Sequence, residues 1–489
     1  MERLIADDKE GASLSLPRSP LHIGLLALAV AVLAGAGIAL LGPLLFLAGL
    51  VAVVASLLLA TDPVYPLWCV LVVIVLLPFA TLPVDIGVTP TFLEMTIVAT
   101  IAVALFRQTQ QARQELFVSP VGWSLLLFIG LALASFVLGI AHARPSITSL
   151  RRFADLLLSL CWFYVVANVL VEQRSLERSY RLLFLLGGLA AFIGVTLYFL
   201  PGHLAERLLV KLGVFGYPRS GVLRFIEDDP SQPMRAIGTS VDPNVFGGML
   251  AFVGGLIVPQ LFVPGSRRRL LLVWSLLGAV GVALLLTFSR SSMFGLAMAL
   301  AALGLLRHRR LLWLLLAGGL LVLLLPPTRV YVQHFLEGVR GQDLATQMRF
   351  GEYKDAFILV SRYPWLGVGF TGVPDVDIYL GVSSVYLLIA EETGLVGLAL
   401  FLATLMVFFA YTWPRAAMAR REHPYLEALI LGTETAVLAG MVAGVLDHYL
   451  FNLSFPHAAA LLWTTVALGV AGARLAEARF ASSQAKALA

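Results

Sequence analysis

Long apolar runs, separated by short polar segments, fill most of the chain. Their lengths are close to the 20 or so residues that a helix needs to cross the hydrocarbon core of a bilayer. The runs fall at 21–40, 43–61, 65–83, 91–106, 121–140, 152–171, 182–200, 242–262, 270–287, 291–306, 311–325, 383–411, 425–446 and 456–473. This pattern predicts an all-α fold, a polytopic integral membrane helix bundle of about 12–14 transmembrane helices.

Two longer polar segments, 201–241 and 326–382, interrupt the alternation. We expect both to be extracytoplasmic loops, the second with short surface helices. Helical spacing within the second loop would place four side chains on one face: Arg349, Glu352, Tyr353 and Ala356. We expect residues 1–489 to form a single membrane domain, and we expect no cleaved signal peptide because no cleavage site follows the polar start of the chain.

The composition agrees with a membrane location. Hydrophobic residues make up 59% of the chain, charged residues only 13%, and the mean hydropathy is +0.90. A typical soluble domain is about 25% charged, and no water-soluble core could bury this much apolar surface. The net charge of +5 comes mainly from arginines in short loops, where they would meet anionic lipid headgroups. We therefore expect membrane lipids, and no nucleic acid, among the partners.

The placement of Lys and Arg predicts the orientation, because basic residues in short loops stay on the cytoplasmic side. With the N-terminus in the cytoplasm, every short basic loop falls inside, including the clusters Arg267–Arg269 and Arg307–Arg310. We expect a multi-pass protein of the cytoplasmic (inner) membrane, with both the N- and C-termini in the cytoplasm.

The two outer loops are rich in arginine, and two interpretations are open. Long loops translocate regardless of charge, so these arginines could be ordinary solvated surface. Alternatively, the planar guanidinium suits bidentate contact with phosphate, which favours a lipid-linked phosphate at the mouth of the bundle. Arg290, in a tight turn between two apolar runs, supports the second interpretation, although it could also extend to the lipid interface.

The segment from Arg235 to Gly248 joins an arginine to the start of an apolar run. Asp242 is a suitable N-cap and Pro243 suits the first helical position, so a helix should begin here. Such a helix end carries unpaired N–H groups and a partial positive charge, and together with Arg235 it could hold an anion. Asp242 and Asn244 could equally be caps alone.

Four segments, in order, resemble the O-antigen ligase and polymerase superfamily. They read RAIGTSVDPNVFGGMLA, LTFSRSSMFGLA, MRFGEYKDAFILVSRYPWLGVGF and SSVYLLIAEETGLVGLALF, and together they span residues 235–401. The resemblance implies a glycosyltransferase without metal or other cofactor, which takes a glycan from undecaprenyl diphosphate on the outer face and passes it to a glycan or lipid-linked acceptor. It also implies that Arg235, Arg290 and Arg349 hold the diphosphate. We add Arg219 and Arg224, from the same outer loop, as candidates for this role.

One position departs from the family pattern. Ligases of this family usually carry a His, often in a His-Asn pair, just before the YLL part of the fourth segment, whereas this chain has Ser383 and Ser384 at those positions. Serine alone cannot act as a base near neutral pH, so another residue must take the acceptor's proton or the acceptor must differ. Polymerases of the superfamily vary more here, so we favour a polymerase over a ligase.

His448, which follows Asp447 near an outer helix end, is the best substitute for the missing base, although neighbours on a helix would not face each other. Glu352 is a second catalytic candidate, and Tyr353 and Ser384 are candidates for other substrate contacts. Other histidines on the outer side are His142, His203, His334 and His457, and other carboxylates with a place in or near spans are Glu94, Asp155, Glu391, Glu392 and Glu434.

A second functional class remains open. Intramembrane carboxylates, outer arginines and helix N-termini also build the pathways of transporters, so a carrier of a small anion or solute such as bicarbonate is the alternative. Transporters commonly have broken helices in two related halves, and the chain shows no such internal repeat. We therefore rank the transporter second.

Overall fold

The structure is a computed structural model. It describes residues 62–82, 89–110, 116–141, 143–324, 340–341, 344–372, 382–420 and 423–488. The predicted spans 21–40 and 43–61 lie outside these ranges, as do His142, His334 and much of the loop 326–382. The chain divides into two compact units, Met1–Asp62 and Pro63–Ala489, and the described helices and strands belong to the second.

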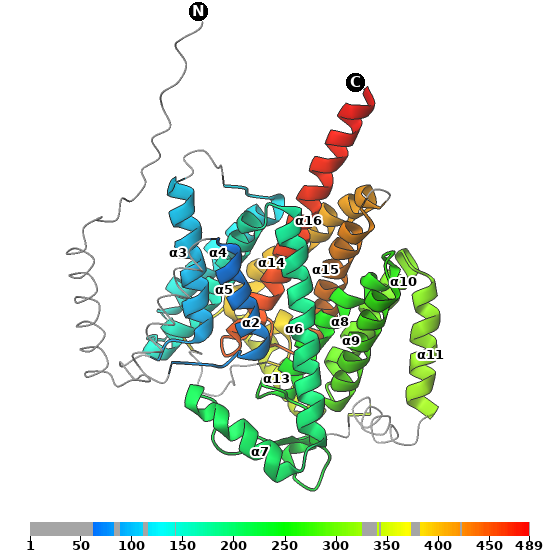
Figure 1. Ribbon diagram of the computed structural model, residues 1–489. Coiled ribbons are helices and arrows are strands. Elements are labelled where there is room, and N and C mark those ends of the chain that lie inside the picture. The colour runs from blue at the N-terminus through cyan, green and yellow to red at the C-terminus, as the bar shows by residue number, and fades with distance from the viewer. Residues whose placement is uncertain are drawn as a thin grey trace, which may run out of the picture. The chain divides into compact units, whose positions relative to one another are not determined.

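The second unit is a helix bundle (Figure 1). Its first part contains α2 (Val64–Leu76), α3 (Phe92–Gln110), α4 (Pro120–Gly139), α5 (Ile147–Val169) and α6 (Gln173–Phe199). The first polar segment contains α7 (Gly202–Lys211), η1 (Leu212–Phe215), β1 (Arg224–Phe225), η2 (Ile226–Asp228) and β2 (Met234–Arg235). There follow α8 (Pro243–Ile257), η3 (Val258–Phe262), α9 (Arg267–Leu286), α10 (Arg290–Leu306), α11 (Arg310–Leu324), α13 (Leu344–Arg362), α14 (Val385–Ala419), α15 (Pro424–Ala443) and α16 (Pro456–Leu488).

Nine helices in the described ranges are long and apolar enough to cross a membrane, and three shorter apolar helices accompany them. Each predicted span inside those ranges coincides with one of these helices, which confirms the all-α class and an integral membrane protein. The main differences are at helix ends. For example, α16 continues to Leu488 because its polar end is rich in good helix formers, and a helix need not stop where its apolar run stops.

Helices α8, α15 and α16 are the most buried of the spans, whereas α9 turns most of its surface outward. Glycines permit the closest approaches between the inner helices. A Cβ on Gly255 of α8 would lie 2.7 Å from the Cα of Ala436 in α15, and one on Gly295 of α10 would lie 2.5 Å from the carbonyl oxygen of Ala439. Small residues of this kind let membrane helices pack backbone to backbone, so α15 is held between α8 and α10.

The first polar segment has more regular structure than we predicted. We expected a loop over 201–241, but α7 and the β1–β2 ribbon occupy much of it. Leu209 of α7 packs with Val222 and Ile237 in a small apolar cluster of their own. The apolar residues of α7 recur at helical spacing over only ten residues, too short a run for a search based on membrane spans to detect.

Helix α14 is interrupted at Gly394, whose φ is +71°. The segment Tyr363–Phe370 packs against this break. Val368 N donates to the carbonyl oxygen of Glu391 (2.8 Å), and Gly369 N donates to that of Glu392 (3.0 Å). On the other side of the break, Leu395 N donates to Pro364 O (2.8 Å). The loop therefore supplies the hydrogen bonds that the helix loses at the break.

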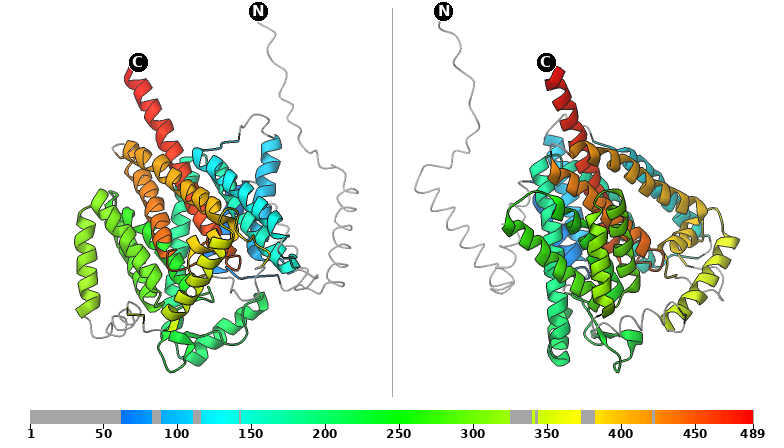
Figure 2. Two further views of the ribbon diagram at one scale, coloured as in Figure 1. Left: turned by 180° about the vertical axis from the view of Figure 1, so that it is seen from behind. Right: turned by 90° about the vertical axis from the view of Figure 1, so that its right-hand side faces the viewer.

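The two ends of the bundle differ. In Figures 1 and 2, α7 and α13 lie at one end, and the α10–α11 turn and the C-terminal end of α16 lie at the other. Helices α8, α10 and α14 all begin at the α7 end. Asp242, Asn244, Arg290 and Ser384 lie at the starts of these three helices, and Arg349, Glu352 and Tyr353 lie in α13.

Candidate functional site

The site is built around the beginning of α8. Asp242 is the N-cap, and its Oδ1 accepts hydrogen bonds from the backbone N–H groups of Asn244 (2.8 Å) and Val245 (2.9 Å). Pro243 occupies the first helical position, as predicted. Val241, directly before the cap, has a φ of +61°, a strained conformation for a β-branched residue. Strain of this kind persists only where the surrounding structure enforces it.

Arg235 ties this turn to the end of α9. Its Nε donates to the carbonyl oxygen of Thr287 (2.8 Å) and its Nη2 to the Oδ1 of Asn244 (2.7 Å). Burial lowers the pKa of the Arg235 guanidinium, while Asp242 and Asp447 act in the opposite direction. The group nevertheless stays charged at neutral pH. Among the described residues, no hydrogen bond uses its Nη1.

Arg224 lies opposite Arg235. The two residues are direct partners in the antiparallel β1–β2 ribbon, so their side chains project from the same face. Arg224 also donates through Nε to the carbonyl oxygen of Val241 (3.4 Å). Like charges directly opposite on a ribbon repel each other, and an anion between them would relieve that repulsion.

Arg290 is the first residue of α10, and the turn before it repeats the pattern at α8. Phe288 has a φ of +54° and Ser289 is the N-cap position. The Ser289 hydroxyl lies 3.2 Å from the hydroxyl of Ser291 and 2.9 Å from that of Ser292. From this turn the Nη2 of Arg290 reaches the Thr346 hydroxyl in the first turns of α13, 3.5 Å away.

Helix α13, which comes from the second polar segment, lies beside the site. As predicted, Arg349, Glu352 and Tyr353 lie on one helix with the fully buried Ala356. Glu352 Oε2 accepts a hydrogen bond from Ser383 N (2.9 Å). The Tyr353 hydroxyl lies 3.2 Å from the carbonyl oxygen of Ser383 and 3.1 Å from that of Val445. Both side chains thus attach α13 to the turns before α14 and after α15.

Asp447 and His448 lie in the turn after α15. The Asp447 Oδ2 accepts from the Ser291 hydroxyl (3.3 Å), and its Oδ1 lies 3.7 Å from the Nδ1 of His448. Burial raises the pKa of Asp447, with Asp242 in the same direction, whereas His448 and Arg349 lower it. The segment is a turn and not a helix, so neighbours can approach, contrary to our expectation for adjacent helical residues. The His448 side chain is 30% exposed.

Two candidates have different surroundings. Arg219 is exposed and donates through Nη2 to the carbonyl oxygen of Gly213 in η1 (3.2 Å), and no hydrogen bond within the described ranges joins it to the other candidates. Ser384 is buried, with its hydroxyl 3.5 Å from the carbonyl oxygen of Gly444. Their roles in substrate binding stay predictions, and the surroundings of Ser384 are those of a packing residue.

The remaining carboxylates lie away from this cluster or have other partners. Glu434 accepts a hydrogen bond from the Thr412 hydroxyl (2.7 Å). Glu94 pairs with Arg151 through two hydrogen bonds of 3.0 Å. Glu391 and Glu392 are buried beside the break in α14. Among the described residues, no group of three or more His, Cys, Asp or Glu side chains is arranged to hold a metal ion.

Residues 274–402 match the family model described as O-antigen ligase. This segment is therefore similar to O-antigen ligases. The match confirms the resemblance to the O-antigen ligase and polymerase superfamily, and it indicates a glycan-transferring membrane enzyme that acts on lipid-linked glycans. None of the curated proteins compared with the chain matches it.

The matched segment contains only part of the site. Arg290, Arg349 and Glu352 lie within residues 274–402, whereas Arg235 and the Asp447–His448 pair lie outside them. Arg235 precedes the matched segment and Asp447 follows it. Their contacts with Thr287 and Ser291 connect both flanking regions to the matched segment. The cluster as a whole therefore depends on both flanks of the matched segment.

Sequence reasoning missed the serines and the connection between the segments. Ser289, Ser291 and Ser292 were visible in the motif around Arg290, but we assigned no role to them. The Ser291–Asp447 hydrogen bond joins residues 156 positions apart, and no spacing rule predicts such a contact. The segment Tyr363–Phe370 carried a clearer sequence signal, because it contains two closely spaced glycines, Gly367 and Gly369. In the structure both have positive φ, as does Gly394 in the following motif.

Proposed function

We propose that the protein is a metal-independent glycosyltransferase of the outer face of the cytoplasmic membrane. It takes a glycan from undecaprenyl diphosphate and passes it to a sugar hydroxyl of an acceptor. The match of residues 274–402 to the O-antigen ligase family supports the general class. The observation that carries the proposal is the convergence of Arg235, Arg290 and Asp447 at one end of the bundle, through segments far apart in the sequence.

The arginines would hold the donor's diphosphate. Arg235 offers its Nη1, Arg224 faces it across the ribbon, and Arg290 begins α10 beside the partly positive end of that helix. Arg349 approaches from α13, since its charge acts on Asp447. Guanidinium groups bind phosphate oxygens in pairs of charge-assisted hydrogen bonds, so together these groups can bind a diphosphate without a metal ion.

The reaction would be a direct displacement. The acceptor hydroxyl oxygen attacks the anomeric carbon and forms the new glycosidic bond. The bond from that carbon to the diphosphate oxygen breaks, and its electron pair remains on the diphosphate. The arginines stabilise the charge that develops on this leaving group. Attack from the opposite side inverts the configuration at the anomeric carbon.

His448 would accept the hydroxyl proton. Asp447 lies 3.7 Å from its Nδ1, so it can orient the ring and balance the charge that the imidazole gains. The partly exposed His448 side chain is accessible to an acceptor. Glu352 is occupied by the Ser383 backbone N–H, which favours a positioning role over that of a base.

We favour a polymerase, in which the acceptor is another lipid-linked glycan. The positions that carry His-Asn in ligases of the family are Ser383 and Ser384, and the Ser384 side chain is buried against Gly444. The base would come from the α15–α16 turn instead, so the acceptor would approach the donor through a different side of the site.

The test is turnover of the purified protein on undecaprenyl-diphosphate-linked repeat units, without metal or nucleotide. Arg290→Ala and Arg349→Ala should each lower the rate of chain growth by about 100-fold or more, the usual cost of removing one group that stabilises developing charge. Arg268→Ala is the matched control, because this exposed arginine lies at the start of α9. It should leave the rate unchanged.

Longer glycan chains would identify a polymerase, and transfer to a different lipid or protein acceptor would identify a ligase. If folded protein transfers no glycan to any acceptor, or if the Arg290 and Arg349 variants turn over like the Arg268 variant, the proposal is wrong.

The break in α14 favours one alternative, a transporter of a small anion or solute. Discontinuous helices with buried carboxylates are typical of transporters, and Glu391 and Glu392 lie beside the break. However, the segment Tyr363–Phe370 already occupies the backbone groups at this break. Uptake of bicarbonate or another small anion by proteoliposomes, without glycan transfer, would favour the transporter.

A further inference from the structure

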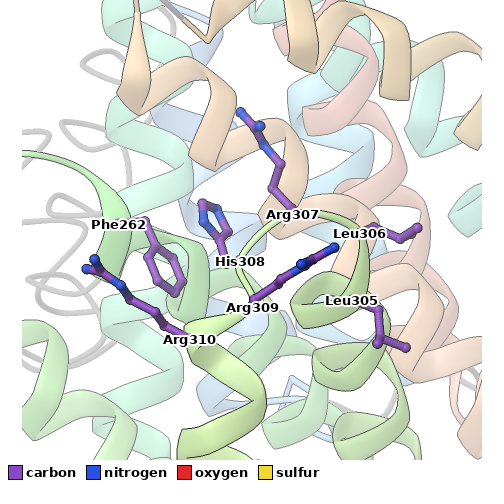
Figure 3. A pocket seen from close by; sticks show the side chains of 7 residues that line it. All are labelled: Phe262, Leu305, Leu306, Arg307, His308, Arg309 and Arg310. Carbon is purple, nitrogen blue, oxygen red and sulfur yellow. The ribbon is translucent and has the colours of Figure 1, made fainter.

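A cavity of about 500 Å³ lies at the turn between α10 and α11 (Figure 3). Its lining consists of Phe262, Leu305, Leu306, Arg307, His308, Arg309 and Arg310. Arg290, in the candidate site, begins α10, and this cavity is at the other end of the same 17-residue helix. The length of such a helix is about 25 Å, so the cavity is separate from the candidate site.

One wall of the cavity is a flat ring pair. The rings of Phe262 and His308 are stacked, with centroids 3.8 Å apart and planes 3° from parallel. Burial lowers the pKa of His308 to about 4, and Arg307 and Arg420 act in the same direction. The imidazole is therefore neutral at pH 7, and the positive charge of the cavity comes from arginines alone.

The arginines of the cavity have different partners. Arg307 donates to Glu427 Oε1 through Nε (2.8 Å) and also through Nη2. The carboxylate of Glu427, in α15, therefore balances the charge of Arg307. Arg309 and Arg310 are exposed, and no described hydrogen bond or salt bridge engages their guanidinium groups. In Figure 3 they extend to opposite sides of the turn, Arg310 past Phe262 and Arg309 toward Leu306.

The surroundings add further positive charge. Arg420 at the end of α14 acts on His308, and Arg269 is attached to the neighbouring η3 through the Gln260 side chain (3.0 Å). Glu427, already paired with Arg307, is the acidic group that α15 contributes here. The charges of Arg309 and Arg310 are thus not balanced by the described carboxylates around the turn.

Apolar surface continues from the cavity. Leu305 and Leu306 are each 66% exposed, and on α11 Trp313 is 72% exposed. In a membrane protein, apolar side chains exposed on the outside of the helix bundle contact acyl chains. A basic recess at the end of such a surface is complementary to the two parts of an anionic lipid, a charged headgroup and the hydrocarbon next to it.

We infer that this cavity binds the phosphodiester headgroup of an anionic phospholipid, held by Arg309 and Arg310 beside the Phe262–His308 ring pair. The acyl chains lie against the apolar side chains of α10 and α11. On the orientation expected from the sequence, the lipid belongs to the cytoplasmic leaflet. The inference does not depend on glycan transfer, because its readout is lipid binding.

The test is native mass spectrometry of the purified full chain, titrated with phosphatidylglycerol or phosphatidylcholine in detergent. We expect the protein to bind phosphatidylglycerol more tightly than phosphatidylcholine. The double variant Arg309→Gln/Arg310→Gln should weaken phosphatidylglycerol binding about tenfold or more, because the loss of a single charge-assisted hydrogen bond already has about that effect. The matched control is Arg267→Gln/Arg268→Gln, which removes the same charge from exposed residues of α9. It should retain the affinity of the original protein.

Three results would overturn the inference. Equal weakening in both double variants would show diffuse attraction by a basic surface. Equal affinity for the two lipids would show that the headgroup charge is not recognised. Loss of phosphatidylglycerol binding in millimolar inorganic phosphate would show that the arginines form a site for free phosphate and that the rest of the lipid is not recognised.

Discussion

Asp447 accepts hydrogen bonds from Ser291 and from the His448 backbone N–H, and it is almost fully buried. A carboxylate in this position costs stability if it is charged, since its pKa is raised by burial. Its proximity to both the His448 ring and the α10 turn suggests that this cost is maintained for function. Stability and activity should therefore respond to its removal in opposite ways.

We predict that Asp447→Asn lowers turnover by about 100-fold or more, because an amide cannot balance a charged imidazole. The folded protein should be as stable as the original or more stable, because the amide can keep the hydrogen bond from Ser291 without a buried charge. Glycan transfer and thermal unfolding of the same preparation measure the two effects. A variant that loses activity only because it unfolds would contradict the functional role.

The same substitution gives a pH prediction. The folded pKa of Asp447 is raised, so the folded state holds the proton more tightly than the unfolded state. This contribution to stability is fully present below the ordinary carboxyl pKa of about 3.9 and is lost as the pH rises through the raised value. The unfolding temperature of the original protein should fall across that window, and Asp447→Asn should lack this part of the fall.

Residues differ in how far the sequence alone identified their environment. Asp242 as an N-cap and Arg349 with Glu352 and Tyr353 on one helix followed from neighbours within a few positions, and the structure confirms these arrangements. The contact of Arg235 with Thr287 spans 52 positions, and that of Ser291 with Asp447 spans 156. Local hydrogen-bonding rules carry no information at such separations. The sequence alone therefore could not predict that these residues come together, and the structure was needed to show it.

At the scale of elements, the break in α14 has a strict steric requirement. A Cβ on Gly394 would lie 2.2 Å from the carbonyl oxygen of Trp365, and the φ of +71° is unfavourable for any other residue. The loop Tyr363–Phe370 and α13 are consecutive in the chain. The break therefore fixes the position of α13 at the site.

We predict that Gly394→Ala displaces this loop and destabilises the protein by about 3 kcal/mol or more, from the combined strain and overlap. Gly351→Ala in α13 is the control, because a Cβ there meets no atom within 4 Å and the residue is helical. It should be neutral or stabilise by about 1 kcal/mol. Thermal unfolding in detergent compares them, and similar stability of the two variants would refute the role assigned to the break.

The helices were predictable from the sequence where an apolar run is long enough to cross the membrane. Every predicted span in the described ranges became a helix, because spanning backbone in lipid must satisfy its own hydrogen bonds. Helix α7 was not predicted, since it is short and lies in a polar segment. The break in α14 was also missed, because hydropathy averages over a single glycine.

For the whole molecule, the two ends of the bundle have different arginine environments. At one end Arg224, Arg235 and Arg290 surround the candidate site, and at the other Arg267, Arg268, Arg309 and Arg310 form exposed clusters. The positive-inside rule predicts that the exposed clusters lie in the cytoplasm and that the candidate site faces outward.

Cysteine labelling tests this orientation. The chain has 2 cysteines, Cys69 and Cys161, so a background of Cys69→Ser/Cys161→Ser permits single additions. We predict that Glu206→Cys in α7 reacts with a membrane-impermeant maleimide on intact spheroplasts, whereas Arg268→Cys reacts only after lysis. Both original residues are exposed, so accessibility should depend on the side of the membrane alone. The reverse pattern would contradict the expected topology.

The pairing of Arg224 with Arg235 across the ribbon has a kinetic consequence. On the proposed mechanism, the diphosphate carries more negative charge after the glycan has left than before. The two arginines remain opposite each other in either state, because the backbone of the ribbon fixes their positions. The spent carrier should therefore bind more tightly than the donor that delivered the glycan. Departure of undecaprenyl diphosphate, and not bond formation, should then set the pace of successive turnovers.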